Sequence, residues 1–425
     1  MPRKPIFALV DCNNFFASCE TLFRPDLKNK PLIVLSNNDG CVVARSKEAK
    51  QLGIKMGVPF YQIKDLVNRY QVATFSSNYA LYADLSSRVM SALETLAPQV
   101  EVYSIDEAFL DLTGIDNLTS LFDFGLTLRQ TLQQWTKIIV CVGIAPTKTL
   151  AKLANHAAKH YTKTQGVVDL TTRERQQKLL ALVPVGEVWG IGRKLTQRME
   201  NEGIHTALDL ANANLHYIRK HYSVVVERIV RELNGESCLP LESITPTKQQ
   251  IVFSRSFSQR IHKFAAMREA ISDYTARAAE KLRKEQRYAK MITVFMRTNP
   301  FNPSEPRYAP SRSLEMTIPT DDTRELIKAS HALLQQIWQD GHRFMKAGVM
   351  LSDFYEPGIY QPSLFDPATP HANSQTLMKL LDQVNHSSAG RLYIASQGMR
   401  KDWSMKRQKL SPSYTTRWED IPWVV

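Results

Sequence analysis

Strand and helix signals follow a defined order through residues 1–172 once residues 17–76 are set aside as an insertion. Apolar runs and two-residue alternation predict the strands, and leucine or valine at every fourth position predicts the helices. The expected elements are strands at 6–10, 100–103, 108–112 and 138–144, and helices at 77–96, 118–135 and 147–160. Up to residue 144 this is the strand–helix–strand–strand–helix–strand order of a ferredoxin-like domain.

This order brings two acidic segments to one edge of the predicted sheet. Right-handed crossovers make the first two strands parallel and place the third strand between them, antiparallel to both. The first strand ends at Asp11, and the hairpin that joins the next two strands turns at Asp106 and Glu107. We therefore expect these three carboxylates to lie together although they are far apart in the chain.

Three neighbouring carboxylates repel one another unless a cation offsets their charge. Hard divalent cations such as Mg²⁺ prefer oxygen ligands, and the backbone carbonyl of Cys12 can supply one more. Two such ions about 4 Å apart stabilise the attacking and leaving oxygens of a phosphoryl transfer. The alternative is a solvated Asp-Glu turn, with Asp11 as the N-cap of a helix that begins near Asn13. The predicted convergence of the two segments favours the metal site.

Basic and aromatic side chains accompany the acidic edge. The basic ones are Arg45, Lys47 and Lys50 in the insertion, near a short helix predicted between Ser46 and Gly53, and Lys148, Lys152 and Lys159 on or beside the helix at 147–160. Lysines that face a carboxylate–metal cluster would hold a triphosphate, although a solvated helix face explains any one of them equally well. Phe16 follows Asp11 closely and could press on a nucleotide sugar, leaving no room for a 2′-hydroxyl; the alternative for Phe16 is core packing.

Charge and cysteine usage narrow the class of protein. Lys and Arg number 54 against 41 Asp and Glu, a net charge of +13, which indicates a polyanionic partner such as nucleic acid or an anionic membrane surface. No run approaches the about 18 apolar residues of a membrane span. The 5 cysteines are scattered, without Cys-x-x-Cys spacing, so neither a disulfide framework nor a zinc site is indicated. We expect a cytoplasmic protein without a membrane partner.

Several long motifs resemble one known family. They are Asp-Cys-Asn-Asn-Phe-Phe-Ala-Ser-Cys-Glu at 11–20, Leu-Ser-Asn-Asn-Asp-Gly-Cys at 35–41, Ser-Ser-Asn-Tyr at 76–79, Tyr-Ser-Ile-Asp-Glu-Ala-Phe at 103–109 and Asn-His-Ala-Ala-Lys at 155–159. Together they resemble the Y-family translesion DNA polymerases, and are most similar to the UmuC branch, the catalytic subunits of the bacterial polymerase V type. The similarity runs from Phe7 to about Arg417, nearly the whole chain.

The resemblance implies an α+β multidomain fold shaped like a right hand. A ferredoxin-like palm would comprise 1–16 and 77–172, with a small fingers insertion at 17–76. A helical thumb with a helix-hairpin-helix would occupy 173–240, and an α/β little finger 246–356. Residues 357–425 would form a linker with a clamp-binding peptide and a partner-binding tail.

The resemblance also implies roles for single residues. Asp11, Asp106 and Glu107 would be catalytic and hold two Mg²⁺ ions, or Mn²⁺ in their place, with the Cys12 carbonyl assisting. Phe16 would be the steric gate that excludes ribonucleotides. Lys50, Lys159 and Lys47 would contact the triphosphate. The chain departs from its relatives at two of these positions, because many carry Tyr at the gate and some carry Tyr at position 47.

Two further groups of residues are expected to bind DNA. Gly190 and Gly192 resemble a helix-hairpin-helix turn, in which backbone N–H groups meet a DNA phosphate beside Arg193 and Lys194; a plain turn is the alternative. Residues 253–297 carry 11 Lys and Arg against 4 Asp and Glu, which suits a little finger that grips duplex DNA. Within that segment we expect contacts from Arg255 and Arg260, with scattered solvated charge as the alternative.

Residues in the last part of the chain are expected to bind protein partners. Gln361, Leu364 and Phe365 resemble the Gln-x-x-Leu-Phe peptide by which bacterial polymerases bind the sliding clamp. The resemblance implies that the tail and body engage a processed UmuD dimer and RecA. Residues 391–417 carry 7 basic residues and 1 acidic residue, so another DNA contact would fit the tail equally well.

Together with these features, the resemblance implies an error-prone, template-directed DNA polymerase. It would extend primed and damaged DNA with dNTPs during the SOS response, by two-metal nucleotidyl transfer and without proofreading. One alternative is a non-catalytic DNA-binding scaffold of the same fold, against which the intact acidic residues argue. Another is a palm-based cyclase, which would need neither the helix-hairpin-helix nor the clamp peptide.

Overall fold

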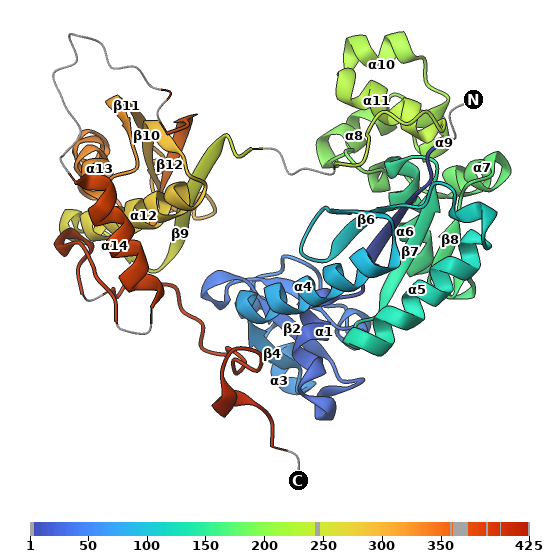
Figure 1. The fold of residues 1–425 in the computed structure, drawn as a ribbon, viewed down its shortest axis with the longest axis horizontal. Coiled ribbons are helices and arrows are strands. Elements are labelled where there is room, and N and C mark those ends of the chain that lie inside the picture. Colours follow the sequence, from blue (N-terminus) through green and yellow to red (C-terminus); the bar gives the residue numbers. More distant parts are fainter. Residues whose placement is uncertain are drawn as a thin grey trace. The chain divides into compact units, whose positions relative to one another are not determined.

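The computed structural model describes residues 4–242, 247–357, 359, 373–387, 390–399 and 401–423. They form two compact units (Figure 1). The first comprises Met1–Ser36, Gly40–Thr245 and Lys409–Val425, and the second comprises Asn37–Asp39 and Pro246–Gln408. Each unit has its own sheets and hydrophobic core. Among the helices of the described residues, none combines the length and apolarity that a bilayer crossing demands.

A five-stranded sheet lies at the centre of the first unit. Its strands stand in the order β5 (Gln99–Val102), β6 (Glu107–Asp111), β1 (Phe7–Cys12), β7 (Val140–Ala145) and β8 (Val167–Asp169). Strand β6 runs antiparallel to both β1 and β5, so it separates two parallel strands as the element order predicted. Strand β8, which pairs in parallel with β7, was not predicted.

Helices cover both faces of this sheet, so the side chains of β1 are buried on both sides. Ala8 and Val10 belong to the core formed with α4 (Tyr79–Leu96) and α5 (Leu121–Thr136). Phe7 and Leu9 belong to the core formed with α6 (Lys148–His160). This two-residue alternation is the ordinary consequence of side chains pointing to opposite faces of a strand.

Helix α6 approaches β7 very closely. A Cβ on Gly143 of β7 would lie 2.2 Å from the backbone nitrogen of Asn155 and 2.3 Å from the carbonyl oxygen of Ala151. Because α6 and β7 are this close, the Asn155 side chain reaches the strand backbone. Its Nδ2 donates to the Cys141 carbonyl at 2.8 Å and to the Leu9 carbonyl at 3.3 Å. One buried side chain therefore ties α6 to both central strands.

The insertion forms a small subdomain. Helix α1 (Phe15–Leu22) leads into a three-stranded sheet of order β3 (Val42–Arg45), β2 (Leu32–Leu35) and β4 (Ala73–Ser76). Helices α2 (Lys47–Gln51) and α3 (Phe60–Arg69) complete it, around a separate apolar core that includes Ile33, Leu35 and Val67. The predicted short helix is confirmed as α2, whose N-cap Ser46 accepts a hydrogen bond from the Ala49 backbone N–H.

Residues 173–233 are helical, as the sequence predicted. The helices are α7 (Arg173–Leu182), α8 (Arg193–Asn201), α9 (Ala207–Ala211), α10 (Leu215–His221) and α11 (Val224–Leu233). Their apolar side chains share one core with α6 and with Phe7 and Leu9 of β1. This helical part therefore packs against the face of the sheet opposite α4 and α5.

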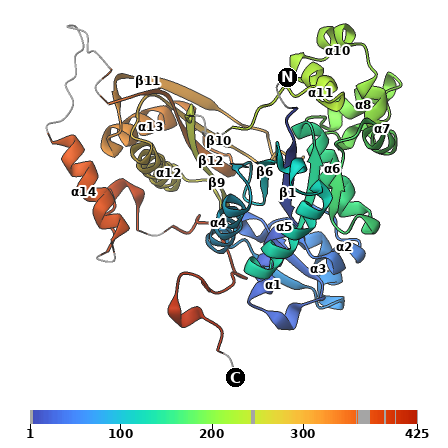
Figure 2. The same cartoon turned by 45° about the vertical axis from the view of Figure 1, so that its right-hand side comes forward.

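The second unit contains a four-stranded sheet of order β11 (Ser311–Thr320), β10 (Tyr288–Arg297), β12 (Phe344–Tyr355) and β9 (Gln250–Ile261). Helices α12 (Phe264–Lys284) and α13 (Thr323–Ile337) lie side by side along one face (Figure 2). This mixture of strands and helices agrees with the α/β character expected of residues 246–356.

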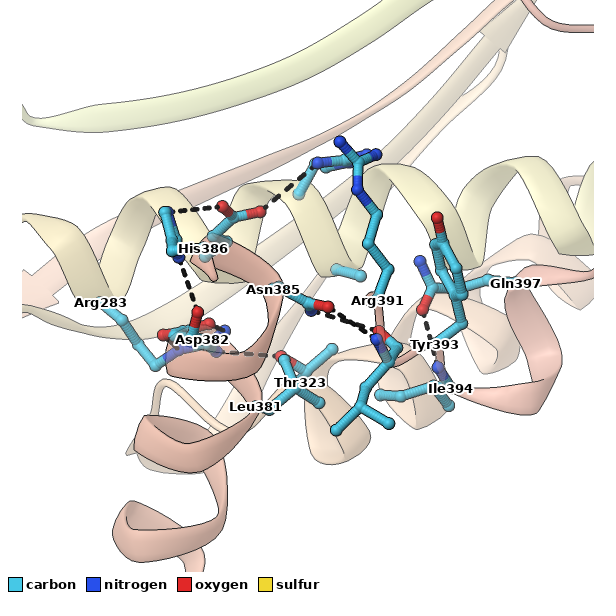
Figure 3. A pocket seen from close by; sticks show the side chains of 14 residues that line it. Arg283, Thr323, Leu381, Asp382, Asn385, His386, Arg391, Tyr393, Ile394 and Gln397 are labelled. Carbon is cyan, nitrogen blue, oxygen red and sulfur yellow. Dashed lines mark hydrogen bonds and ion pairs between the residues drawn. The ribbon is translucent and has the colours of Figure 1, made fainter. Parts of the chain in front are cut away.

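A further helix, α14 (Ser374–His386), is held against α12 by a buried arginine (Figure 3). The Arg283 guanidinium donates to both carboxylate oxygens of Asp382, at 2.6 and 2.7 Å, and to Thr323 Oγ1 at 2.9 Å. The Arg283 side chain is 8% exposed. A bidentate pair of this kind fixes the orientation of the two helices, because water has little access to the guanidinium of Arg283.

Candidate active site

Three carboxylates meet at one edge of the central sheet of the first unit. Asp11 of β1 pairs in register with Glu107 of β6. The Cys12 backbone N–H donates to the Asp106 carbonyl at 2.8 Å, which fixes the hairpin turn beside the end of β1. The convergence expected from topology is therefore present in the structure.

Each of these carboxylates has a polar partner. Lys159 Nζ lies 2.6 Å from Asp11 Oδ2, and Lys152 Nζ lies 2.7 Å from Glu107 Oε2. Both lysines come from α6, whose position over β7 follows from Gly143 and Asn155. The Asp106 carboxylate accepts from the Ser104 hydroxyl at 2.7 Å, and this same hydroxyl oxygen accepts from the Asp106 and Glu107 backbone N–H groups.

Burial and neighbouring charges shift the pKa values of two carboxyl groups in the cluster. The Asp11 side chain is 8% exposed, and desolvation raises its pKa to about 7 against the opposing charge of Lys159. For Glu107, desolvation also raises the pKa, but a hydrogen bond from Asp11 and the charges of Lys152 and Lys159 outweigh it and lower the pKa overall. The pKa values of the two neighbouring carboxyl groups are therefore shifted in opposite directions, and Asp11 is the one that holds a proton more readily.

The donor set fits hard divalent cations. Within the described residues, no group of three or more His, Cys, Asp and Glu side chains is already arranged to hold a metal ion. The carboxylates of Asp11 and Glu107 nevertheless form a crowded acidic pair, each with a lysine as its partner. Oxygen-only ligands with excess negative charge are what Mg²⁺ prefers, so the residues present suit such an ion.

A pocket of about 240 Å³ opens beside the acidic edge. Residues of both signs line it, including Asp11, Asp106, Phe16, Arg45, Lys50 and Lys159. Lys50 Nζ donates to Asn14 Oδ1 at 2.6 Å, and burial together with the charges of Arg45 and Lys159 lowers the Lys50 pKa. A cavity with acids on one side and crowded cations on the other suits a polyphosphate whose reacting phosphorus lies between them.

The predicted basic residues do not all reach this pocket. Lys47 is exposed in the first turn of α2 and is not part of the pocket lining. Lys148 is buried, where its Nζ pairs with Glu101 Oε2 at 2.5 Å and lies over the Phe109 ring. Arg45 lines the pocket although its family role was not predicted, and its Nη1 donates to the Ile54 carbonyl at 2.7 Å.

The Phe16 ring is held by two tyrosines of α4. It stacks on Tyr82 with ring centroids 4.4 Å apart and an interplanar angle of 15°, and meets Tyr79 edge-on at 5.7 Å. The Tyr82 hydroxyl donates to Glu20 Oε1 at 2.5 Å in a buried site. Phe16 therefore has both of the environments considered from the sequence. Its ring packs against core aromatics and also lines the pocket.

The glycines expected in a helix-hairpin-helix turn lie just before α8. Gly190 has φ 91° and its missing side chain makes room for Ile229, since a Cβ would lie 2.7 Å from the Ile229 Cδ1. Gly192 is the N-cap of α8 and carries no capping side chain, so it leaves backbone N–H groups of the first turn directed outward. Arg193 and Lys194 are exposed in that turn.

The basic residues expected on the second unit have other partners. Arg255 lies over the Phe253 ring at 4.4 Å, on the same face of the sheet as α12. Arg260 forms an ion pair with Glu305. The strand register instead places Arg297 of β10 opposite Lys346 of β12, on the face away from α12 and α13.

Small polar residues lie on the same face of the sheet as this cationic pair. Ser256 of β9 stands opposite Lys346, and Thr293 of β10 stands opposite Ser313 of β11, with their hydroxyl groups 2.8 Å apart. Burial and the neighbouring positive charges of Arg297 and Arg255 lower the Lys346 pKa. Short hydroxyl side chains with two cations form a surface that a phosphate backbone can approach closely. The sequence alone did not predict this patch. Assigning a residue to one face of the sheet requires the strand register, and composition does not give the register.

The predicted clamp-binding residues, Gln361, Leu364 and Phe365, fall outside the described residues.

Comparisons with known proteins agree with this geometry. Residues 10–156 match the model of the impB/mucB/samB family, residues 248–364 match the C-terminal domain of that family, and residues 375–424 match a domain of unknown function. Protein UmuC of Salmonella typhimurium is 54% identical over 98% of this chain and 99% of its own length. A DNA polymerase IV of Desulfatibacillum aliphaticivorans is 26% identical over 88% of this chain and 92% of its own.

Solved structures show the same fold. A Y-family DNA polymerase chimera of Dbh and Dpo4 matches with a TM-score of 0.67 and 23% identity, covering 83% of this chain and 99% of its own. An insertion ternary complex of Dbh DNA polymerase matches with a TM-score of 0.54 and 22% identity, covering 83% of this chain and 99% of its own.

The family models, the UmuC relative and the shared fold together place the chain among the DNA polymerases of the Y family. The chain belongs to the impB/mucB/samB family, whose members include UmuC, and it is a UmuC-like translesion polymerase. Two-metal nucleotidyl transfer and the lack of proofreading are general features of Y-family polymerases.

Proposed function

We propose that the acidic edge and its pocket form the nucleotidyl-transfer site of an error-prone polymerase that acts in the SOS response to DNA damage. The observation that carries the proposal is the meeting of Asp11, Asp106 and Glu107 beside a cavity lined by Phe16, Lys50 and Lys159. The substrates are a primed, damaged DNA template and dNTPs.

Asp11, Asp106 and Glu107, with the Cys12 carbonyl, would hold two divalent ions. When bound, Mg²⁺ or Mn²⁺ supplies charge stabilisation to the attacking and leaving oxygens of the reaction. With the ions bound, Asp11 and Glu107 would need their lysine partners less. Lys159, which lines the pocket, would then be available to a phosphate.

The reaction joins the primer to the incoming nucleotide. The primer 3′-oxygen forms a bond to the α-phosphorus, and the bond from that phosphorus to the pyrophosphate oxygen breaks. Arg45, Lys50 and Lys159 bind the triphosphate and stabilise the charge on the departing pyrophosphate. Lys47, exposed in the first turn of α2 and outside the pocket lining, would contact only a part of the triphosphate that extends beyond the pocket.

Phe16 sets the choice of sugar. Its ring lines the pocket within the same short segment as Asp11 and is braced by Tyr82 and Tyr79. A 2′-hydroxyl on the incoming sugar would meet this ring, so ribonucleotides are excluded by shape. The gate works without a hydroxyl group of its own.

The domains follow the right-hand plan of the family. The palm comprises 1–16 and 77–172, the fingers 17–76, the thumb 173–240 and the little finger 246–356, with a linker and tail at 357–425. The thumb binds the DNA backbone through Gly190, Gly192, Arg193 and Lys194 at the start of α8. The little finger binds it through the open sheet face around Arg297 and Lys346. Arg255, on the α12 face, and Arg260, paired with Glu305, are separate candidate contacts.

Partner proteins act through the end of the chain. Gln361, Leu364 and Phe365 bind the sliding clamp, and the tail with the body engages a processed UmuD dimer and RecA. All described cysteines are free thiols, which suits work in the reducing cytoplasm at the nucleoid.

Primer extension tests the proposal. Asp106→Ala is expected to abolish extension of both damaged and undamaged templates while duplex binding is retained. Asp116→Ala, an exposed acid away from the pocket, is the matched control and keeps full activity. Normal extension by Asp106→Ala would remove the acidic edge from the reaction.

A further inference from the structure

The charged end of the Lys152 side chain lies among three aromatic rings. Its Nζ is 4.5 Å from the ring centroid of Tyr103, 5.3 Å from that of Trp189 and 6.0 Å from that of Phe109. An ammonium group is attracted to the face of an aromatic ring at such distances, and most strongly to Trp. The three rings therefore favour one position for the end of an otherwise flexible side chain.

The same ammonium group is the partner of Glu107. Lys152 Nζ lies 2.7 Å from Glu107 Oε2, and the side chains of the two residues are 16% and 20% exposed. Lys159, the partner of Asp11, lines the nucleotide pocket, whereas Lys152 is not part of that lining. Lys152 is thus placed to stay beside its acid, while Lys159 can move to a phosphate.

Two of the rings belong to the hairpin that carries Glu107. Phe109 is buried in β6, and the Tyr103 backbone N–H donates to the Glu107 carbonyl at 3.1 Å across the turn. The rings of Tyr103 and Phe109 contact each other with centroids 5.6 Å apart. The third ring, Trp189, meets Tyr103 edge-on at 5.7 Å and Phe109 at 6.2 Å. The three rings therefore hold one another in place.

Trp189 comes from a distant part of the chain, the turn before α8. The Ile191 backbone N–H donates to the Val188 carbonyl at 3.0 Å, which closes the turn around Trp189 and Gly190. Val188 and Ile191 are both buried in the core shared by α6 and β1. Gly190 has φ 91°, a value that favours glycine at the third position of a turn. Buried anchors on both sides thus fix the backbone from which the indole projects.

We infer that Trp189 is a positioning residue for the reaction, acting through Lys152 on the carboxylate of Glu107. This inference rests on the proposed role of Glu107 in the acidic edge. Without the indole, the Lys152 ammonium loses one of its aromatic contacts and is less restricted to Glu107 Oε2. The carboxylate is then held less firmly in the orientation that the reaction needs, and small displacements of a catalytic group lower the rate strongly. The turn proposed to bind DNA therefore also supports the chemistry.

Single-turnover incorporation of a dNTP by the full-length chain on primed DNA tests this inference. Trp189→Leu is expected to lower the maximal rate by about three- to tenfold. The dNTP concentration at half-maximal rate should not change, because Trp189 does not line the nucleotide pocket. Trp189→Phe keeps an aromatic face and should restore most of the rate. Trp135→Leu replaces an exposed tryptophan of α5 and is the matched control, with an unaltered rate.

Duplex binding separates this role from a DNA contact. The equilibrium affinity of Trp189→Leu for primed DNA is expected to equal that of the original chain. A variant that loses duplex affinity but keeps its maximal rate on saturating DNA would assign Trp189 to the DNA contact alone and overturn the inference.

A double-mutant cycle tests whether Trp189 acts through Lys152. Lys152→Met is expected to lower the maximal rate by about tenfold or more, and adding Trp189→Leu should lower it little further, because the ring then has no ammonium group to hold. Thermal unfolding in metal-free buffer supplies a second cycle that is independent of catalysis, in which the two losses of stability should sum to more than the loss in the double variant. Additive losses of rate overturn the inference even if the unfolding cycle shows coupling, since the contact would then be structural only.

Glu107→Ala distinguishes failure of this inference from failure of the proposed function. If Glu107→Ala incorporates dNTPs at the original rate, the acidic edge itself is wrongly assigned. If Glu107→Ala abolishes incorporation while Trp189→Leu leaves the rate unchanged, only the role of Trp189 fails.

Discussion

Lys159 Nζ lies 2.6 Å from Asp11 Oδ2, so the floor of the proposed nucleotide pocket is closed by an ion pair between α6 and β1. The Asp11 side chain is almost fully buried and the Lys159 side chain is about one-third exposed. The lysine can therefore move to a phosphate in the pocket, whereas the aspartate cannot leave its strand. Because only the lysine can move, Lys159 can leave Asp11 and pair with a phosphate when substrate binds.

Replacing Lys159 is expected to weaken substrate binding more than folding. A hydrogen bond to a charged group contributes about 1.5–3 kcal/mol, so Lys159→Met should raise KM for dNTPs by roughly tenfold or more. Steady-state incorporation kinetics measure this. Lys163→Met, three positions beyond α6 and away from the pocket lining, is the control. An unchanged KM in Lys159→Met would place the triphosphate elsewhere.

Shortening Phe16 is expected to relax sugar selection. Without the ring, a 2′-hydroxyl fits, and rNTP discrimination should fall by about ten- to a hundredfold, the range that shape-based pockets provide. The measurement is kcat/KM for paired dNTP and rNTP substrates. Phe16→Tyr keeps the ring and should retain discrimination. The gate assignment is wrong if Phe16→Ala still rejects ribonucleotides.

The open face of the second sheet is expected to bind the DNA backbone. Removing both Arg297 and Lys346 should weaken duplex binding uniformly across sequences and reduce the salt slope by about 0.9 per lost phosphate contact. Equilibrium binding at several salt concentrations tests this. Arg312→Ala is the matched control, because Arg312 pairs with Val294 in register and therefore points to the face of α12 and α13. If Arg312→Ala weakens duplex binding equally, the loss reflects the net charge of the protein and not contacts made by this face.

The peptide at 361–365 is expected to bind the clamp. Two apolar anchors in a groove are hot spots worth about 2 kcal/mol or more each, so replacing Leu364 and Phe365 by alanine should abolish clamp binding. Distributive synthesis without the clamp should be unaffected. Ser363→Ala, between the polar and apolar anchors, serves as the control. Retained clamp affinity in the double variant would refute the motif.

A methyl group at position 143 is expected to destabilise the first unit. Its Cβ would lie 2.2 Å from the Asn155 backbone nitrogen, so α6 must move from β7, at a cost of about 1–3 kcal/mol. Thermal unfolding measures the loss. Gly192→Ala is the control, since a Cβ there meets nothing within 4 Å and the backbone has negative φ. Equal stability of the two variants would contradict the close packing of α6.

The acidic edge could be predicted from sequence because topology rules convert element order into position. Handedness and antiparallel pairing were enough to bring Asp11 to Glu107. Individual contacts could not be predicted in this way. The face on which Arg255 lies depends on strand register, and the pairing of Lys148 with Glu101 depends on how α6 rotates over the sheet. The contact between Ser411 and Asn78 joins distant segments, and neither periodicity nor composition carries a signal for it.

Asn155 links the carbonyls of Leu9 and Cys141 to α6, and so mounts the anionic and cationic walls of the pocket on one block. The insertion that supplies Arg45 and Lys50 has an apolar core of its own, but Leu32, Val34 and Ala44 also join the core of β1. A change in the packing of the insertion is therefore felt at the strand that carries Asp11. Substrate grip and chemistry are mechanically coupled within the first unit.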